Sequence, residues 1–125
     1  MLHNLQQGDT VRFAGERLPY TVMATSDRYA VVSRKLNRRE DAGLLHHRVE
    51  MNAYSTFTEA YNAHKNDPVY SLLDFQEGLR APSDSVFDSH DYSDAGDCQV
   101  AVQLLESGKV CLSRRNQTEI ILTNA

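Results

Sequence analysis

The stretch that decides the fold reads Tyr20-Thr-Val-Met-Ala24, then Ser26-Asp27, then Tyr29-Ala-Val-Val-Ser33. The two outer segments are rich in the β-branched and aromatic residues that strands favour, and the short polar break between them is typical of a hairpin turn. Upstream, Asp9-Thr-Val-Arg-Phe13 alternates polar and apolar residues, and a turn is expected at residues 14–17. The pattern predicts a three-strand antiparallel meander.

The middle of the chain is more helical in character. Thr56-Phe-Thr-Glu59 fits a capping box, in which the threonine hydroxyl and the glutamate satisfy backbone amides at a helix start. We expect one helix within residues 44–66, ended by Asn66-Asp67-Pro68 because proline disfavours helix in the residue before it. Val69–Phe75 is apolar enough for a fourth strand near the sheet centre, whereas Gly78–Ser85 is expected to form a loop.

The last third of the chain predicts a second helix, begun by Ser93-Asp94 and ended at Gly108 in the left-handed position. The buried stripe of this helix is expected to be Cys98, Ala101, Val102 and Leu105. Short strands are expected at Val86-Phe87, Lys109–Ser113 and Glu119–Thr123. The whole pattern indicates an α+β fold with an antiparallel sheet of about five strands, a middle helix and a C-terminal helix, as a single nucleotide-binding domain over residues 1–125.

The composition is typical of a globular protein and argues against a membrane or secreted protein. Hydrophobic residues make up 41% of the 125 residues and charged residues 24%, as in ordinary globular domains. No apolar run approaches the ~18 residues of a membrane span, and the first seven residues lack the features of a secretory signal. We therefore expect a cytoplasmic protein with no membrane partner, in which Cys98 and Cys111 are free, buried thiols.

The charge is unevenly distributed along the chain. The net charge of −4 is the balance of +2 over residues 1–50 and −6 over residues 51–125. A protein that coats duplex nucleic acid is expected to be basic, because neutralisation of phosphates drives that binding. Nucleic acid is therefore a disfavoured partner, and the mixed-charge stretch 34–41 is interpreted as a solvated connection.

Metal binding and catalysis find little support among the motifs. His46 and His47 are neighbours whose side chains point apart, and the other histidines fall on separate elements, so no metal site and no cofactor are expected. The aspartates between 84 and 97 lack the glycine and the glutamate of a calcium loop. No nucleophile elbow, P-loop or dinucleotide fingerprint is present, and we expect no enzymatic activity.

The remaining polar candidates have the chemistry of a nucleotide pocket. An arginine fork matches two phosphate oxygens, an aromatic face stacks on a purine, and an asparagine amide reads a base edge or a ribose hydroxyl. The candidate ligand-binding residues are Arg80, Phe87, Arg114, Arg115 and Asn116. The alternative interpretation is a charged surface strand, with Arg114 and Arg115 on opposite faces.

The order of several short motifs resembles a family of small phage and prophage proteins, the first anti-Thoeris sponge family. The motifs cover most of the chain, with 34–66 as the variable part. They are Gly8-Asp-x-Val-Arg-Phe13, Tyr20-x-Val-x-Ala24, Asp27-Arg-Tyr-Ala30, Val69-Tyr-Ser-Leu-x-Asp74, Gly78-x-Arg80-x-Pro82-x-Asp84-x-Val-Phe87, Leu105-Glu-Ser-Gly108 and Ser113-Arg-Arg-Asn116.

The resemblance implies a non-catalytic function. Proteins of that family sequester the cyclic ADP-ribose isomer made by bacterial TIR defence enzymes, and also hold cyclic oligonucleotide signals at separate sites in a symmetric oligomer. It implies a homo-oligomer in the cytoplasm of the infected bacterial cell. By the same resemblance, Phe87 would stack on the adenine, Arg114, Arg115 and Asn116 would hold phosphate and ribose, and Arg80 would shape the loop.

Two other functions stay open from the sequence. The first is a small SH3-like, β-rich adaptor that binds nucleic acid or a host protein, because a Gly-Asp-x-Val start followed by a meander begins many such barrels. Its basic face would hold Arg12, Arg28, Arg34, Arg38 and Arg39. The second is a phage inhibitor that contacts a host protein through the acidic residues 84–97, Asp91 and Asp94 among them.

Overall fold

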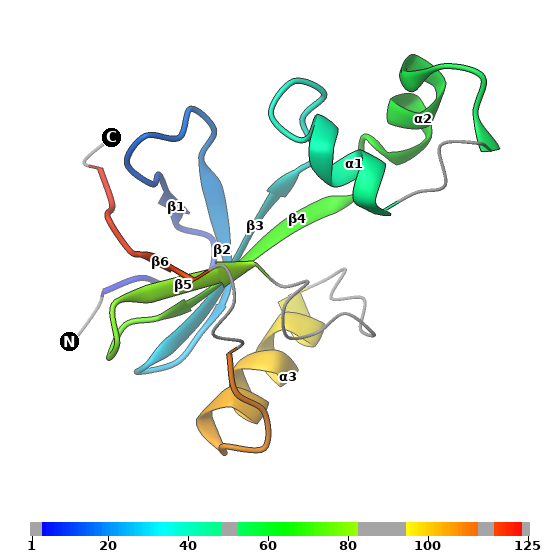
Figure 1. Cartoon of the computed structure of the whole chain (residues 1–125). Coiled ribbons are helices and arrows are strands. Elements are labelled where there is room, and N and C mark those ends of the chain that lie inside the picture. Colours follow the sequence, from blue (N-terminus) through cyan, green and yellow to red (C-terminus); the bar gives the residue numbers. More distant parts are fainter. Residues whose placement is uncertain (1–3, 49–52, 83–94, 113–116, 124–125) are drawn as a thin grey trace. The chain divides into compact units, whose positions relative to one another are not determined.

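The computed structural model describes residues 4–48, 53–82, 95–112 and 117–123 (Figure 1). These residues fall into two compact units. We call residues 1–34 with 70–125 the sheet unit and residues 35–69 the insert unit. The insert unit lies in the chain between two strands of the sheet, and each unit is described by itself.

Six strands form one sheet in the described residues, in the spatial order β1-β2-β3-β4-β5-β6. The pairs β1-β2, β2-β3, β4-β5 and β5-β6 are antiparallel, which confirms the α+β class with one strand more than expected. The strands are β1 (Thr10–Val11), β2 (Tyr20–Thr25), β3 (Tyr29–Lys35), β4 (Pro68–Asp74), β5 (Leu79–Pro82) and β6 (Thr118–Glu119).

The additional strand is β5, which occupies part of the predicted loop Gly78–Ser85. Gly78 has a φ of +70°, a left-handed conformation that lets the chain turn sharply after β4. Leu79 then pairs with Asp74, and Ala81 with Leu72. The loop prediction was wrong for Leu79–Pro82, because the tight turn ends at Gly78 and leaves these residues free to join the ladder, whereas residues 83–85 of the predicted loop lie outside the described residues.

The sheet curls until its two ends meet. Phe13, just beyond β1, forms a bridge with Leu122, just beyond β6. The Ala14 N–H donates to the Ile121 carbonyl at 2.7 Å, and the Thr123 N–H donates to the Arg12 carbonyl at 2.9 Å. The predicted strand Glu119–Thr123 is thus realised as short β6 followed by this isolated bridge.

The inside of the curl is filled by apolar side chains. In β3, Ala30 and Val32 point into this cluster, whereas Tyr29 and Val31 point to the opposite face. In β2, a register shift between Val22 and Ala24 places these two residues on different faces, with Val22 in the inner cluster and Ala24 in the cluster on the opposite face. The buried residues of the inner cluster are Val11, Phe13, Tyr20, Val22, Ala30, Val32, Leu73 and Phe75.

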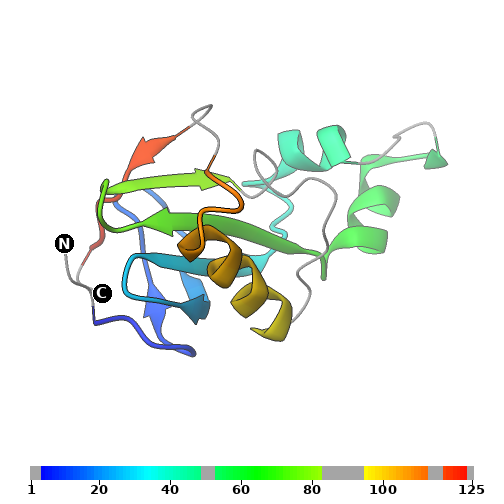
Figure 2. The ribbon, with the colours of Figure 1, turned by 90° about the horizontal axis from the view of Figure 1, so that it is seen from below.

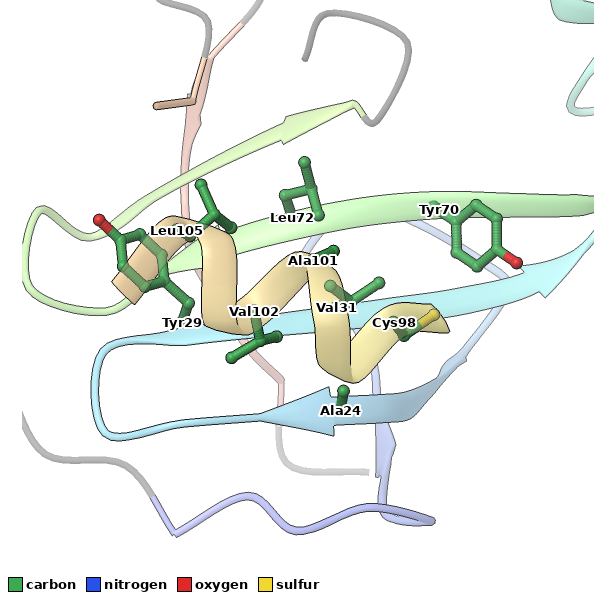
Figure 3. Packing of buried hydrophobic residues seen from close by; sticks show 9 residues of the cluster. All are labelled: Ala24, Tyr29, Val31, Tyr70, Leu72, Cys98, Ala101, Val102 and Leu105. Atoms are coloured by element: carbon green, nitrogen blue, oxygen red, sulfur yellow. The ribbon is translucent and has the colours of Figure 1, made fainter. Parts of the chain in front are cut away.

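Helix α3 (Ala95–Glu106) covers the other face of the sheet, as Figure 2 shows. Its buried stripe is the predicted one, with exposed fractions of 0–2%. Figure 3 shows these side chains against the sheet residues that complete the cluster: Ala24, Tyr29, Val31, Tyr70, Leu72, Cys98, Ala101, Val102 and Leu105.

The end of α3 is confirmed at Gly108. This glycine has a φ of +77°, and its N–H donates to the Leu105 carbonyl at 3.2 Å. The expected strand Lys109–Ser113 is absent over its described residues 109–112, which carry no strand assignment. The predicted strand at Val86-Phe87 and the cap at Ser93-Asp94 lie outside the described residues.

The insert unit holds two helices where one was expected, α1 (Ala42–Arg48) and α2 (Phe57–His64). The capping box explains why α2 begins so late. Thr56 Oγ1 accepts the Glu59 N–H at 3.2 Å, as predicted, and Glu59 Oε2 accepts the Ser55 N–H at 3.0 Å. The buried core of this unit is Leu36, Leu45, Ala60 and Val69.

A Tyr–His–Asp chain of hydrogen bonds closes the end of α2. His64 Nε2 lies 3.0 Å from the Tyr54 hydroxyl, and His64 Nδ1 lies 2.8 Å from Asp67 Oδ2. The carboxylate oxygen can only accept, so the proton between His64 and Asp67 sits on Nδ1. His64 thus links the end of α2 to Tyr54, which precedes the helix, and to Asp67, which follows it.

No helix in the described part of the chain is long and apolar enough to cross a membrane.

The packing of α3 gives a matched test of the fold. Val102 is fully buried and Val100 is 51% exposed, two residues away in the same helix. Val102→Ala should lower the free energy of unfolding by about 2 kcal/mol, because it removes buried methyl groups and leaves a cavity. Val100→Ala should change it by less than about 0.5 kcal/mol. Urea denaturation of both variants measures the difference, and similar losses would contradict the orientation of α3.

Candidate functional site

A hollow of about 410 Å³ lies on the sheet unit. Pockets that enclose small molecules commonly measure a few hundred cubic ångströms, so this volume is suited to a ligand of that size. Three parts of the chain that are distant in sequence form its walls: the start of β3, the turn from β4 to β5, and the segments that flank residues 113–116. The lining residues are Arg28, Tyr29, Asp74, Glu77, Leu79, Cys111, Leu112 and Gln117.

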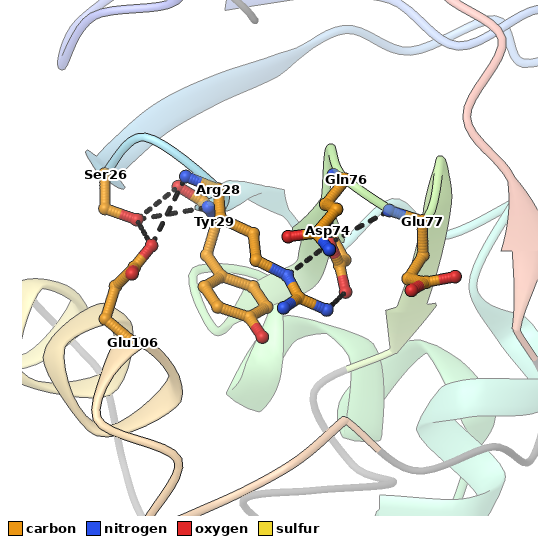
Figure 4. Close-up of polar contacts among 7 residues, drawn as sticks. All are labelled: Ser26, Arg28, Tyr29, Asp74, Gln76, Glu77 and Glu106. Atoms are coloured by element: carbon orange, nitrogen blue, oxygen red, sulfur yellow. Dashed lines mark hydrogen bonds and ion pairs between the residues drawn. The ribbon is translucent and has the colours of Figure 1, made fainter. Parts of the chain in front are cut away.

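A bidentate ion pair between Arg28 and Asp74 lines this hollow (Figure 4). Arg28 donates from Nε to Asp74 Oδ1 at 3.0 Å and from Nη2 to Asp74 Oδ2 at 2.9 Å. Asp74 Oδ1 also accepts the backbone N–H groups of Gln76 at 3.1 Å and Glu77 at 3.2 Å. The pair joins the start of β3 to the end of β4, where the Phe75 N–H donates to the Arg28 carbonyl.

The surroundings of this pair set its protonation. Burial alone would raise the pKa of Asp74, but the hydrogen bonds from Arg28 and Glu77 and the guanidinium charge outweigh it and hold that pKa below its ordinary value. The hydrogen bond to Asp74 raises the pKa of Arg28. Both groups therefore stay charged at neutral pH.

Tyr29 lies beside the ion pair, with the Arg28 Cζ atom 5.0 Å from its ring centroid, a cation–π contact. Burial raises the pKa of the Tyr29 phenol, and the nearby guanidinium only partly opposes this shift. The phenol therefore stays protonated under physiological conditions.

The end of α3 holds the turn before β3 in place. Glu106 Oε1 accepts the Ser26 hydroxyl at 2.7 Å and the Arg28 N–H at 3.3 Å. Ser26 Oγ in turn accepts the Tyr29 N–H at 3.1 Å. Figure 4 shows this network beside the ion pair, so the wall of the hollow is supported from the helix as well as from the sheet.

Sequence reasoning did not select Arg28 and Asp74 as site residues. The two residues are 46 positions apart in the sequence. Arg28 had been considered only for the basic face of the alternative adaptor. A usable signal was present, because Arg28 stands at the start of one predicted strand and Asp74 near the end of the next. When two strands are adjacent and antiparallel, the start of one and the end of the other lie side by side.

Arg80 is the predicted ligand residue that the structure describes, and its partners lie within the chain. It pairs with Leu73 in the ladder and so points into the curl. Its guanidinium lies 3.7 Å from the Phe13 ring centroid and forms an ion pair with Glu16. Nη2 also donates to Ser71 Oγ at 3.3 Å and to the Tyr20 hydroxyl at 3.4 Å. These contacts account for most of its donors.

The other predicted ligand residues, Phe87, Arg114, Arg115 and Asn116, lie outside the described residues. Leu112 and Gln117, the described residues that flank 113–116, both line the hollow. Cys111 lines it too and is exposed, unlike Cys98, so the expectation that both thiols are buried was wrong for Cys111. Among the described residues, no group of three or more His, Cys, Asp or Glu side chains could hold a metal ion.

The contacts of Arg80 predict a structural role in the free protein. Arg80→Ala should lower the free energy of unfolding by about 2 kcal/mol, because it removes a stacked guanidinium that is only 14% exposed. Arg12→Ala, at an exposed position, should change it by less than about 0.5 kcal/mol. Urea denaturation without ligand measures both, and equal stabilities of the two variants would contradict this role.

The lowered pKa of Asp74 predicts a pH-dependent contribution to stability. Because the folded-state pKa lies below the ordinary 3.8, this contribution is present above that pH and is lost as the pH falls towards the folded-state value. Asp74→Asn should cost about 2 kcal/mol at pH 7, the strength of hydrogen bonds to a charged group. The difference from the original protein should be smaller at about pH 2 than at pH 7, because protonation of Asp74 is favoured as the pH falls and removes the charge that the asparagine variant lacks.

Urea denaturation at both pH values checks this expectation, with Asp27→Asn as the control. Asp27 is exposed and neighbours Arg28 in the chain. Its neutralisation should leave stability almost unchanged at either pH. A loss in Asp74→Asn that is the same at both pH values would show that the ion pair does not carry the effect.

No known protein family, curated protein or solved structure matches this chain. The resemblance to anti-Thoeris sponges therefore stays a prediction, and the function has to be argued from the site.

Proposed function

We propose that this protein is a non-catalytic sponge that binds and sequesters cyclic nucleotide immune signals, and so inhibits the antiphage defence of the host. The ligand would be a cyclic ADP-ribose isomer, with cyclic oligonucleotides as further signals. The protein would act as a homo-oligomer in the cytoplasm of the infected bacterial cell.

The observation that carries the proposal is the hollow on the sheet unit. It combines a fixed guanidinium, an aromatic side chain and an amide in Arg28, Tyr29 and Gln117. Leu79 and Leu112 add apolar side chains to the lining, which also holds Asp74, Glu77 and Cys111. A small molecule with both ring and polar parts suits such a wall.

Chain connectivity links this hollow to the residues selected from sequence. Leu112 and Gln117 line it, and just four residues separate them, Arg114, Arg115 and Asn116 among these. The guanidinium groups that a nucleotide phosphate requires are therefore close in sequence to the lining on both sides. This proximity supports a nucleotide over an uncharged ligand.

The rigidity of the described wall also supports sequestration. Arg28 is held by Asp74, and the turn before it is held by Glu106. A pocket that is ordered before the ligand arrives loses less conformational entropy on binding, which favours high affinity. Slow release, which a sponge needs, follows from such affinity.

The titratable groups of the described wall favour binding over turnover. A general acid or base works best with a pKa near the operating pH. The pKa of Asp74 is lowered, whereas those of Arg28 and Tyr29 are raised, so each of these three groups moves away from neutrality. Proton transfer by them at neutral pH is therefore disfavoured.

A β-rich adaptor is the second candidate, and the curled sheet favours it, because the bridge between Phe13 and Leu122 brings the sheet ends together as in small barrels. Its basic face is less well supported. Arg28 is neutralised by Asp74, and Arg38 and Arg39 belong to the insert unit. Steeply salt-dependent binding of DNA or RNA would favour this candidate.

Native mass spectrometry of the protein with cyclic ADP-ribose isomers and cyclic di- and trinucleotides tests the proposal. An intact cyclic ADP-ribose isomer should be retained and recovered after heat release, and Arg114→Ala should abolish retention because it removes a phosphate-binding fork. Arg39→Ala removes the same charge from an exposed site in the insert unit and should retain the ligand. The spectra also give the subunit number. Failure to retain any nucleotide would refute the proposal.

A further inference from the structure

The described wall of the hollow has a hydrogen-bonding capacity that can be counted. A carboxylate offers about four acceptor positions, and Asp74 receives four donors: Arg28 Nε, Arg28 Nη2 and the N–H groups of Gln76 and Glu77. Three of these donors reach Oδ1 and one reaches Oδ2. Asp74 therefore serves mainly to orient Arg28, and one acceptor position on Oδ2 remains.

Glu77 differs from Asp74 in this respect. It is exposed and lines the same hollow, and its carboxylate accepts no hydrogen bond from the described residues. Its oxygens remain acceptors for a ligand. Arg28 spends two of its five N–H donors on Asp74, which leaves three for a ligand oxygen.

The charges of this wall do not suit a phosphate. Arg28 carries one positive charge, and Asp74 and Glu77 carry one negative charge each, so the three together carry −1. The positive charge of Arg28 is already balanced by Asp74 at 2.9 Å. A phosphate beside Glu77 would meet like-charge repulsion that nothing in the described lining offsets.

Hydroxyl groups suit the same wall well. A carboxylate that accepts from ribose hydroxyls is a recurring element of nucleotide sites, because the diol presents two donors to its oxygens. The free N–H groups of Arg28 can donate to the hydroxyl or ring oxygens of the same sugar. The apolar side chains of Leu79 and Leu112 can contact its carbon atoms.

We propose that this wall is the ribose subsite of the ligand site, in which Glu77 accepts hydrogen bonds from the sugar hydroxyls and the phosphates face away from Glu77. The inference rests on the proposed function, because it orients a nucleotide in the hollow that the sponge would use. It adds a direct ligand contact at Glu77, a residue that sequence reasoning did not select.

The sign of the Glu77→Gln effect separates a sugar from a phosphate. If ribose binds here, Glu77→Gln should weaken binding of a cyclic ADP-ribose isomer about tenfold, the equivalent of one hydrogen bond to a charged group. If a phosphate binds here, removal of the negative charge should tighten binding. Isothermal titration calorimetry of the full chain measures either change, and tighter or unchanged binding would overturn the proposal.

Two controls make the result specific. Glu119→Gln removes the same charge from an exposed position in β6 that does not line the hollow, and it should leave affinity unchanged. Adenosine and 2′,3′-dideoxyadenosine serve as uncharged probes. The original protein should bind adenosine more tightly than the dideoxy compound, and Glu77→Ala should remove that preference.

The same experiments separate this inference from the proposed function. Retention of a cyclic nucleotide with no loss of affinity in Glu77→Gln overturns the ribose subsite alone. Binding of adenosine that depends on Glu77, without retention of any cyclic nucleotide, refutes the sponge and supports the subsite. If neither adenosine nor a cyclic nucleotide binds, both are refuted.

Discussion

Burial of β3 on both faces is the constraint on which the sheet unit depends. Ala30 and Val32 contribute to the cluster inside the curled sheet, whereas Tyr29 and Val31 contribute to the cluster under α3. Because one strand serves two cores, its register cannot slip by a residue without exposing one set of side chains and burying the other in the wrong cluster. The helix and the curl of the sheet are therefore coupled through this strand.

The candidate site lies where the start of β3 meets the end of β4. Tyr29 belongs to the α3 cluster and also lines the hollow. Its neighbour Arg28 donates to Asp74 at the end of β4. Glu106 at the end of α3 accepts the Arg28 N–H and so holds the turn before β3. The polar wall is thus built at the ends of elements whose side chains are packed in the two buried clusters, and a site on such elements is held more firmly than one on loops alone.

Arg80 illustrates how one residue type serves two purposes in this chain. In β5 its guanidinium stacks on Phe13, a member of the inner cluster, and forms an ion pair with Glu16. Arg28 makes a comparable bidentate pair, but in the wall of the hollow. The planar fork of arginine allows both arrangements, whereas a lysine would provide neither the stacking nor the two parallel hydrogen bonds.

The sequence by itself determined the local elements whose signals are short in range: the hairpin at Ser26-Asp27, the cap at Thr56, the buried stripe of α3 and the stop at Gly108. Tertiary structure alone decided that β5 pairs with β6, that the ends of the sheet meet at Phe13 and Leu122, and that Arg28 forms an ion pair with Asp74. The physical reason is the separation along the chain of the residues that interact. A cap or a helical stripe is specified within a few residues, whereas strand partners and ion pairs depend on which distant segments the packed core brings together.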